Sequence, residues 1–237
     1  MNFNPTKNWQ ATDPIWEKFK RNPLLDQIHV IRVNVPKNIE TISEVKNLLS
    51  ASELEKLNRI VRQQDKDTFL VSNLMKKILC GKYLNILPEE VRLAEGDNKK
   101  PYLPDHPNLH FNTSHSGDWV VFIFSNYPCG IDLEKIQWDF DSSGVMDISF
   151  HQQEKEFVLQ SANPLLSFFR IWTMKESLLK ATGKGLIDNL PQLNMLEAPT
   201  HLENNAPWQI KSFLIDNDYW CSICMQQMDL EIKYFEF

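Results

Sequence analysis

The sequence predicts an α+β protein made of two similar subdomains that meet near residue 129. Each half contains one long helical pattern. In each half that helix is followed by segments that alternate apolar and polar residues, as antiparallel strands do. The length of 237 residues allows one large domain or two small ones. We therefore expect residues 1–129 and residues 130–237 to form the two halves of a pseudo-dimer.

The first half begins with a strand pattern and continues into helix. Residues 29–35 alternate apolar and polar side chains and are rich in β-branched residues, which is typical of a strand. Ser52 is the expected N-cap of the next segment, because Glu55 three residues later completes a capping-box pattern. Apolar residues at helical spacing predict an amphipathic helix over residues 68–84.

Strands follow this helix. Residues 109–114 and 119–124 are strand candidates, and the Ser-Gly-Asp sequence at 116–118 provides the turn of a hairpin between them. A further strand-like segment covers residues 130–134, at the start of the second half.

The second half repeats this order. Residues 152–160 fit a short helix. Asn163 as N-cap and Pro164 in the first turn predict the start of a long helix, and Gly183 lies where a glycine commonly follows a helix end. Strands are expected near residues 208–215, 219–225 and 231–235.

Charge narrows the classes of function. Lys and Arg number 25 against 31 Asp and Glu, a formal net charge of −6, which argues against a protein that wraps nucleic acid. Residues 1–129 hold 17 basic and 15 acidic residues, whereas residues 130–237 hold 8 and 16. This division suits an anionic ligand on one side and a cation on the other, although ordinary solvated helix faces explain the same counts.

The sequence predicts a reduced cytoplasmic protein that contacts no membrane. The N-terminus is polar, and no run approaches the roughly 18 apolar residues of a membrane span. The four cysteines are too few for a disulfide scaffold. Cys221 and Cys224 have CxxC spacing, but a zinc site needs a second pair, and residues three apart on a strand point to opposite faces.

Three acidic residues are candidates for a metal site. Asp132 and Glu134 are two residues apart on a predicted strand, so both side chains leave the same face, roughly 6.6 Å apart along the chain. Glu176 on the long helix supplies a third carboxylate, and Mg²⁺ prefers such oxygen ligands. Taken without other motifs, a solvated strand edge explains the first two residues, and an i,i+4 pair with Lys180 explains the third.

Four motifs change this balance. Lys-Pro at 100–101, Ser-His-Ser-Gly at 114–117, Gly-Ile-Asp at 130–132 and Trp-Thr-Met-Lys-Glu-Ser-Leu-Leu-Lys at 172–180 follow one another along the chain. This series, within residues 50–186, resembles the 4′-phosphopantetheinyl transferase superfamily in its long single-chain, pseudo-dimeric form. Enzymes of that family move the phosphopantetheine arm of coenzyme A onto a serine of a carrier protein and release 3′,5′-ADP.

The resemblance implies a role for each matching residue. Asp132, Glu134 and Glu176 match ligands of Mg²⁺, and Lys175 and Lys180 match contacts to the pyrophosphate. The other coenzyme A contacts implied by the resemblance are Lys56 at the 3′-phosphate, Lys100 and Pro101 at the adenine-side turn, and the Ser114 backbone and His115 at the phosphates and nucleotide.

The catalytic residues implied by the resemblance are Glu154, Lys175 and Glu176. Glu154 matches an acidic position proposed to help deprotonate the acceptor serine, whose proton could also go to Lys175 or to a water on the metal.

Three positions depart from the family pattern. Thr173 replaces the usual Ser or Cys, and Lys99 stands where a glycine often precedes Lys-Pro. Glu53 stands where a second lysine for the 3′-phosphate can occur, with Arg59 or Arg62 as possible substitutes.

The resemblance thus implies a Mg²⁺-dependent phosphopantetheinyl transferase, monomeric and acting on acyl, peptidyl or polyketide carrier proteins. Coenzyme A is expected in the cleft between the two halves. Two alternatives stay open. The same carboxylates suit a metal-dependent nuclease or phosphohydrolase, and the motifs also suit a module that binds coenzyme A or a carrier protein without turnover.

Overall fold

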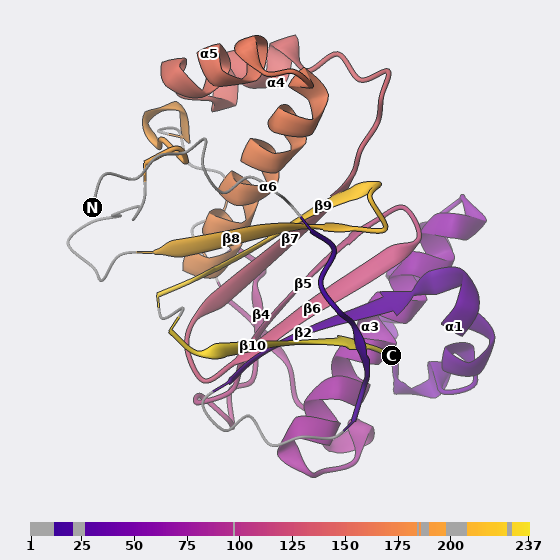
Figure 1. The fold of residues 1–237 in the computed structure, drawn as a ribbon. Coiled ribbons are helices and arrows are strands. Elements are labelled where there is room, and N and C mark those ends of the chain that lie inside the picture. Colours follow the sequence, from indigo (N-terminus) through magenta and orange to yellow (C-terminus); the bar gives the residue numbers. More distant parts are fainter. Residues whose placement is uncertain are drawn as a thin grey trace.

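The computed structural model describes residues 12–20, 27–96, 98–183, 185, 190–197, 208–226 and 229–237. It confirms the α+β class, with two sheets at the centre and the helices on their outer faces (Figure 1). The larger sheet has the order β1 (Glu17–Lys18), β10 (Glu231–Glu236), β2 (Gln27–Asn34), β6 (Trp119–Ser125), β5 (His110–Ser116). The smaller sheet has the order β7 (Cys129–Lys135), β9 (Tyr219–Met225), β8 (Gln209–Ile215).

Six α-helices and three short 3-10 helices accompany these sheets in the described part of the chain. The α-helices are α1 (Val35–Ser43), α2 (Ala51–Arg59), α3 (Gln63–Leu84), α4 (Ser143–Ser149), α5 (Gln152–Gln160) and α6 (Pro164–Thr182). The 3-10 helices are η1 (Lys46–Leu48), η2 (Pro88–Glu90) and η3 (Leu190–Gln192). A separate two-stranded sheet joins β3 (Ala94–Glu95) to β4 (Pro101–Tyr102).

The two halves share one topology. In the first half, β2 leads through α3 to the hairpin β5–β6, and the sheet order β2-β6-β5 puts the last strand in the middle. In the second half, β7 leads through α6 to the hairpin β8–β9, and the order is β7-β9-β8. Both sets of three strands are antiparallel. This repeated order supports the predicted pair of similar subdomains.

Apolar residues hold the layers together. One cluster, including Val121 of β6 and Ile131 of β7, draws residues from both sheets. A second cluster packs α1 and α3 against the larger sheet, and further clusters pack α6 against the smaller sheet. Cys221 belongs to the first cluster and Cys224 to a cluster beneath α6, so the two thiols face opposite sides of β9, as strand periodicity predicts. All four cysteines are buried and free.

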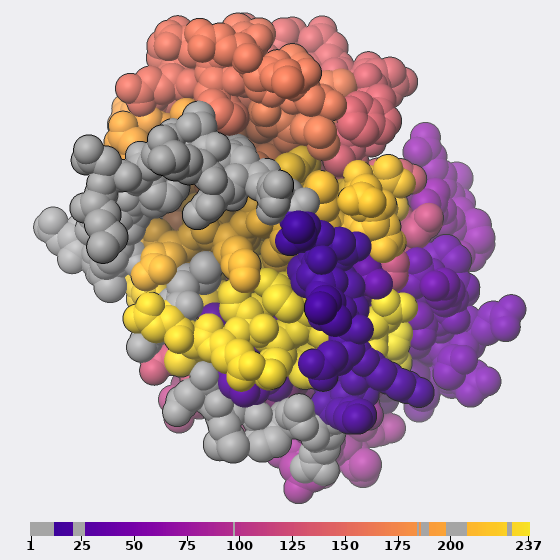
Figure 2. Space-filling model, viewed as in Figure 1, coloured from indigo at the N-terminus to yellow at the C-terminus, as the bar shows by residue number. Residues whose placement is uncertain are grey.

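The C-terminal strand crosses the predicted boundary at residue 129. The sequence assigns residues 231–235 to the second half, but β10 pairs with β2 in parallel, inside the larger sheet. The N-terminal strand β1 pairs with the outer edge of β10. Figure 2 shows the indigo N-terminal segment lying against the yellow C-terminal residues. Parallel pairing between strands so distant in sequence leaves no local pattern, which is why the alternation within each strand could not reveal it.

Local capping decides where the helices begin. The N-cap of α2 is Ser50 rather than the expected Ser52, because Ser50 and Glu53 complete the capping box between them. Pro36 occupies the first turn of α1, where the helix needs no N–H donor from it. The predicted start and end of α6 at Asn163 and Gly183 are confirmed.

A buried histidine in β2 makes stability depend on pH. The His29 side chain is fully buried, and its Nδ1 lies 2.7 Å from the Tyr83 hydroxyl. Burial, helped by the charge of Lys233, lowers the pKa of His29 from 6.5 to about 4. As the pH falls, His29 is therefore protonated near pH 6.5 in the unfolded chain but only near pH 4 in the folded chain.

We expect the free energy of unfolding to fall by up to about 3 kcal/mol between pH 7 and pH 4 through His29. Urea unfolding at pH 7, 5.5 and 4 measures this loss, and His29→Gln should remove it. His106→Gln, in a loop, is the matched control. An unchanged pH slope in His29→Gln would show that other groups cause the acid sensitivity.

Candidate active site

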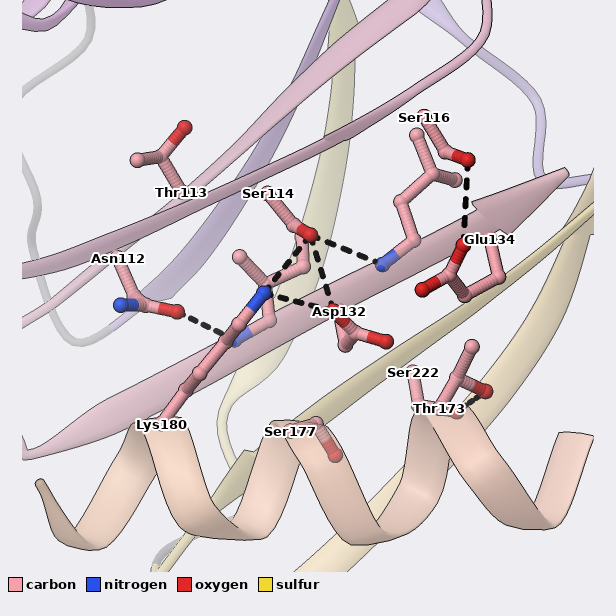
Figure 3. Close-up of polar contacts among 12 residues, drawn as sticks. Asn112, Thr113, Ser114, Ser116, Asp132, Glu134, Thr173, Ser177, Lys180 and Ser222 are labelled. Carbon is pink, nitrogen blue, oxygen red and sulfur yellow. Dashed lines mark hydrogen bonds and ion pairs between the residues drawn. The ribbon is translucent and has the colours of Figure 1, made fainter. Parts of the chain in front are cut away.

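The two sheets meet along a seam between their edge strands β5 and β7 (Figure 3). Asp132 of β7 is almost fully buried in this seam. Lys180 of α6 donates from Nζ to Asp132 Oδ1 at 2.6 Å and to Ser114 Oγ at 2.8 Å. Ser114 Oγ in turn donates to the same carboxylate oxygen at 3.0 Å. The seam thus joins a carboxylate, an ammonium group and a hydroxyl from three different elements.

The second carboxylate oxygen of Asp132 differs from the first because it lacks a hydrogen-bond donor in the described part of the chain. Asp132 Oδ2 is buried and has no hydrogen-bond partner among the described residues. A buried carboxylate oxygen without a donor costs free energy unless a cation or a ligand compensates it.

Glu134 and Glu176 complete the acidic cluster. Burial, followed by repulsion from Asp132, raises the pKa of Glu134 to about 7. The same two causes, in the same order, raise the pKa of Glu176. The negative charges of these carboxylates therefore act on one another. In the part of the chain that the structure describes, however, no three His, Cys, Asp or Glu side chains are arranged as they stand to hold a metal ion.

A glycine lets the helix reach this cluster. Gly130 precedes Asp132 on β7 and lies directly under α6. A Cβ at Gly130 would stand 2.2 Å from the Ser177 carbonyl oxygen and 2.3 Å from the Ala181 nitrogen. Any larger residue would push α6 away from β7, and with it Glu176 and Lys180 away from Asp132. The Gly-Ile-Asp motif therefore combines a packing requirement with a carboxylate.

Two hollows open on the seam beside the cluster. A pocket of about 230 Å³ is lined by Lys100, Pro101, Glu176 and Lys180, among others. The Lys100 ammonium is not free in this pocket, because it donates to the carbonyl oxygens of Cys129 at 3.0 Å and Ala181 at 2.9 Å. Burial lowers the pKa of Lys100. Lys100 thus connects the β4 region of the first half to the end of α6.

The second hollow is a larger cleft of about 610 Å³, lined by residues of α3, β5 and β7. His115 and Ser116 lie in its wall. Partial desolvation, and then the charge of Lys180, lower the pKa of His115. Lys56 is exposed on α2, and its charge acts on Lys76 of α3. No described contact joins Lys56 to the acidic cluster.

The chain is similar to known proteins over most of its length. A family model described as the 4′-phosphopantetheinyl transferase superfamily matches residues 128–224, and a model for the N-terminal part of such transferases matches residues 36–126. The 4′-phosphopantetheinyl transferase gsp of Aneurinibacillus migulanus is 36% identical over 167 residues, which cover 67% of this chain and 67% of the relative. The chain belongs to the 4′-phosphopantetheinyl transferase superfamily.

Two further members of the superfamily show how far the similarity extends. The 4′-phosphopantetheinyl transferase ffp of Bacillus subtilis is 28% identical, over 86% of this chain and 93% of the relative. The L-aminoadipate-semialdehyde dehydrogenase-phosphopantetheinyl transferase of Mus musculus is 26% identical, over 72% of this chain and 60% of the relative. The two family models meet between residues 126 and 128, close to the predicted division at residue 129.

In this member of the superfamily, Glu154 and Lys175 do not lie with the acidic cluster, although both were expected at the reaction centre. Both side chains are fully buried, and Lys175 Nζ lies 2.9 Å from Glu154 Oε2. Lys175 also donates to the carbonyl oxygens of Leu190 and Leu193. Glu154 accepts from the backbone N–H groups of His151 and Met195. Their catalytic roles stay a prediction, while their observed contacts join α5, α6 and residues 190–195.

The sequence motifs did not reveal Ser212 and Ser222, whose hydroxyl groups connect to the helix that carries the second family signature. Thr173, the departure from the usual Ser or Cys, lies 2.8 Å from Ser222 of β9, and Ser222 lies 2.8 Å from Ser212 of β8. Because Thr keeps the hydroxyl group, this chain of hydroxyls, buried at Thr173 and Ser222 and half-buried at Ser212, is complete. The side chains of Ser114 and Ser116 were missed as well, since their only signal was the spacing of two serines on one strand.

The structure contains no helix, within its described residues, that is long and apolar enough to cross a membrane.

Proposed function

We propose that this protein transfers the 4′-phosphopantetheine group from coenzyme A to a serine of an acyl, peptidyl or polyketide carrier protein and releases 3′,5′-ADP. The observation that carries the proposal is the convergence of Asp132, Glu134, Glu176 and Lys180 beside two hollows on one seam. Family membership supports the class of reaction.

The chemistry of the acidic cluster suits a Mg²⁺ ion, although its three carboxylates would have to draw closer together to bind one. Asp132 Oδ2 is a buried oxygen without a donor among the described residues, and burial, followed by repulsion from Asp132, raises the pKa values of Glu134 and Glu176. Oxygen ligands from these three residues are the kind that Mg²⁺ prefers. When bound, the ion would neutralise charge on the pyrophosphate and orient it.

The remaining residues bind and orient coenzyme A. The Lys180 ammonium lies beside Asp132 and is suited to stabilise the pyrophosphate as its phosphorus–oxygen bond breaks. Lys100 and Pro101 would shape the adenine side of the smaller pocket, with Lys100 acting through the backbone that it fixes. His115 and the Ser114 backbone would contact phosphate and nucleotide groups from the other side of the seam. Lys56 is the proposed contact to the 3′-phosphate.

The reaction needs no nucleophile from this chain. The hydroxyl oxygen of the carrier's serine attacks the phosphorus that bears the pantetheine arm, and the bond to 3′,5′-ADP breaks. The serine proton needs an acceptor, and Glu154 remains a candidate only if the buried pair with Lys175 opens. Both walls of the seam come from one chain, so a monomer suffices. Four free buried thiols suit a reducing compartment such as the cytoplasm.

Intact-mass measurement of an apo carrier protein tests this function. The protein, coenzyme A and Mg²⁺ are incubated with several carriers, and we expect a phosphopantetheine adduct on the carrier together with free 3′,5′-ADP. Nucleotide release without an adduct would favour the phosphohydrolase alternative. Binding of coenzyme A with neither product would favour a non-catalytic binding module.

Lys180 gives a prediction with opposite signs for two measurements. Because Lys180 donates to Asp132 Oδ1, it competes with a metal ion for that oxygen in the free protein. We expect Lys180→Met to strengthen Mg²⁺ binding roughly tenfold while lowering the transfer rate on the order of a hundredfold. Calorimetry with MgCl₂ and the carrier assay measure the two effects.

The matched control for this prediction is Lys155→Met, which removes a lysine that pairs with Asp147 at the surface. It should change neither quantity by more than about twofold. Weaker Mg²⁺ binding in Lys180→Met would contradict the competition between the ammonium group and the ion.

A further inference from the structure

Alternate side chains of β5 bond the backbone of β7 across the seam. The N–H of Ile131 donates to Asn112 Oδ1 at 3.0 Å, and the N–H of Leu133 donates to Ser114 Oγ at 3.3 Å. The N–H of Lys135 donates to Ser116 Oγ at 3.0 Å. Each pair is 19 residues apart in sequence, so the two strands run in the same direction in one fixed register. Side chains thus do here what a backbone ladder does inside each sheet.

The two serines also bond the two carboxylates of β7 in the same way. Ser114 Oγ donates to Asp132 at 3.0 Å, and Ser116 Oγ donates to Glu134 Oε2 at 3.2 Å, both over 18 residues (Figure 3). A serine hydroxyl has one hydrogen to donate and two lone pairs that accept. Because the strand N–H occupies a lone pair, each hydrogen can be directed at a carboxylate. The Ser-x-Ser spacing of β5 therefore matches the Asp-x-Glu spacing of β7.

Other groups near Glu134 do not replace this contact. Trp172 of α6 also hydrogen-bonds the Glu134 side chain, but α6 belongs to the same half of the chain as Glu134 and does not tie it to β5. Lys180 donates to Asp132, and no contact between Lys180 and Glu134 is among the described hydrogen bonds and ion pairs. The described hydrogen bond between β5 and the Glu134 carboxylate is the one that Ser116 Oγ donates. Thr113, on the same strand, points elsewhere and donates to the Val121 carbonyl at 3.1 Å.

We propose that Ser116 is a positioning residue that holds the Glu134 carboxylate toward the acidic cluster, as Ser114 holds Asp132. The proposal rests on the proposed function insofar as Glu134 is a ligand of Mg²⁺. Removal of a group that hydrogen-bonds a metal ligand typically weakens metal binding by 10- to 100-fold. Ser116 would thereby act on the metal affinity of the site through the Glu134 carboxylate that it holds.

Titration of the purified full chain with MgCl₂ alone tests the proposal. We expect Ser116→Ala to weaken Mg²⁺ binding about tenfold and Ser116→Thr, which keeps the hydroxyl, to restore most of the affinity. In the carrier assay, Ser116→Ala should need more Mg²⁺ for half-maximal rate and approach the wild-type kcat when Mg²⁺ saturates. Thr113→Ala is the matched control and should leave Mg²⁺ affinity unchanged. Equal Mg²⁺ affinity in Ser116→Ala and the wild type would overturn the proposal.

A crystal structure of metal-free Ser116→Ala separates the inference from the proposed function. We expect the Glu134 side chain to leave its wild-type position or to occupy more than one. A Glu134 side chain that keeps its single wild-type position would overturn the positioning role. If the wild-type chain binds no Mg²⁺, the proposed metal site fails, and the crystal structure decides about Ser116 without it.

Discussion

Asp132→Asn should lower the rate of phosphopantetheine transfer on the order of a thousandfold while leaving the fold intact. The substitution removes the negative charge but keeps an oxygen that can accept from Lys180 and Ser114, which now bond Asp132 Oδ1. The substitution replaces the second oxygen, which has no partner among the described residues, by an NH₂ group that binds a cation poorly. Intact-mass kinetics on a carrier protein measure the loss, and calorimetry with MgCl₂ should show weakened binding.

Asp147→Asn provides the control for this variant. Asp147 is exposed on α4, where it pairs with Lys155, and its loss should change the transfer rate by less than about twofold. Circular dichroism and urea unfolding are the measurements that check whether both variants are folded. If Asp132→Asn retains a rate within tenfold of the wild type, Asp132 is not a ligand of the metal.

Lys175→Met should destabilise the protein by about 3–5 kcal/mol. The substitution leaves the fully buried Glu154 carboxylate without its cation and leaves the Leu190 and Leu193 carbonyl oxygens without their donor. An unpaired buried charge is costlier than an apolar side chain of similar size, so Glu154→Leu added to Lys175→Met should recover most of the loss. Urea unfolding of the single and double variants measures both effects.

The double variant also tests the role that the family resemblance implies for this pair. If Glu154 accepts the serine proton, the folded double variant should lose transfer almost completely. If the pair is structural, the folded double variant should retain transfer within about tenfold of the wild type. Lys155→Met, next to Glu154 but partly exposed, is the control and should cost less than about 0.5 kcal/mol.

The sequence was most informative where local chemistry decides the structure. Asn163 and Gly183 mark the ends of α6 because capping depends on the residues at the helix ends themselves. The facing directions of Cys221 and Cys224 followed from strand periodicity. The motif series predicted the family. Its Gly-Ile-Asp motif combines the glycine that lets α6 pack on β7 with the carboxylate of Asp132.

Contacts between distant segments were decided only by the tertiary structure. Glu154 and Lys175 carry the same charges as Glu176 and Lys180, and nothing in the spacing of these residues distinguishes a buried ion pair from groups that face the seam. Side-chain direction on α6 distinguishes them, because Lys175 points toward residues 190–193 and Lys180 toward Asp132.

The same reason explains the place of β10 and the role of the serines. The pairing of β10 with β2 joins residues about 200 positions apart, and the register of Ser114 and Ser116 against β7 exists only once the two sheets have met. By itself, the sequence determined which residues are available for chemistry and in which elements they lie. The packing of two sheets along one seam decided which of those residues meet, since a polar contact depends on distances of about 3 Å that no spacing along the chain specifies.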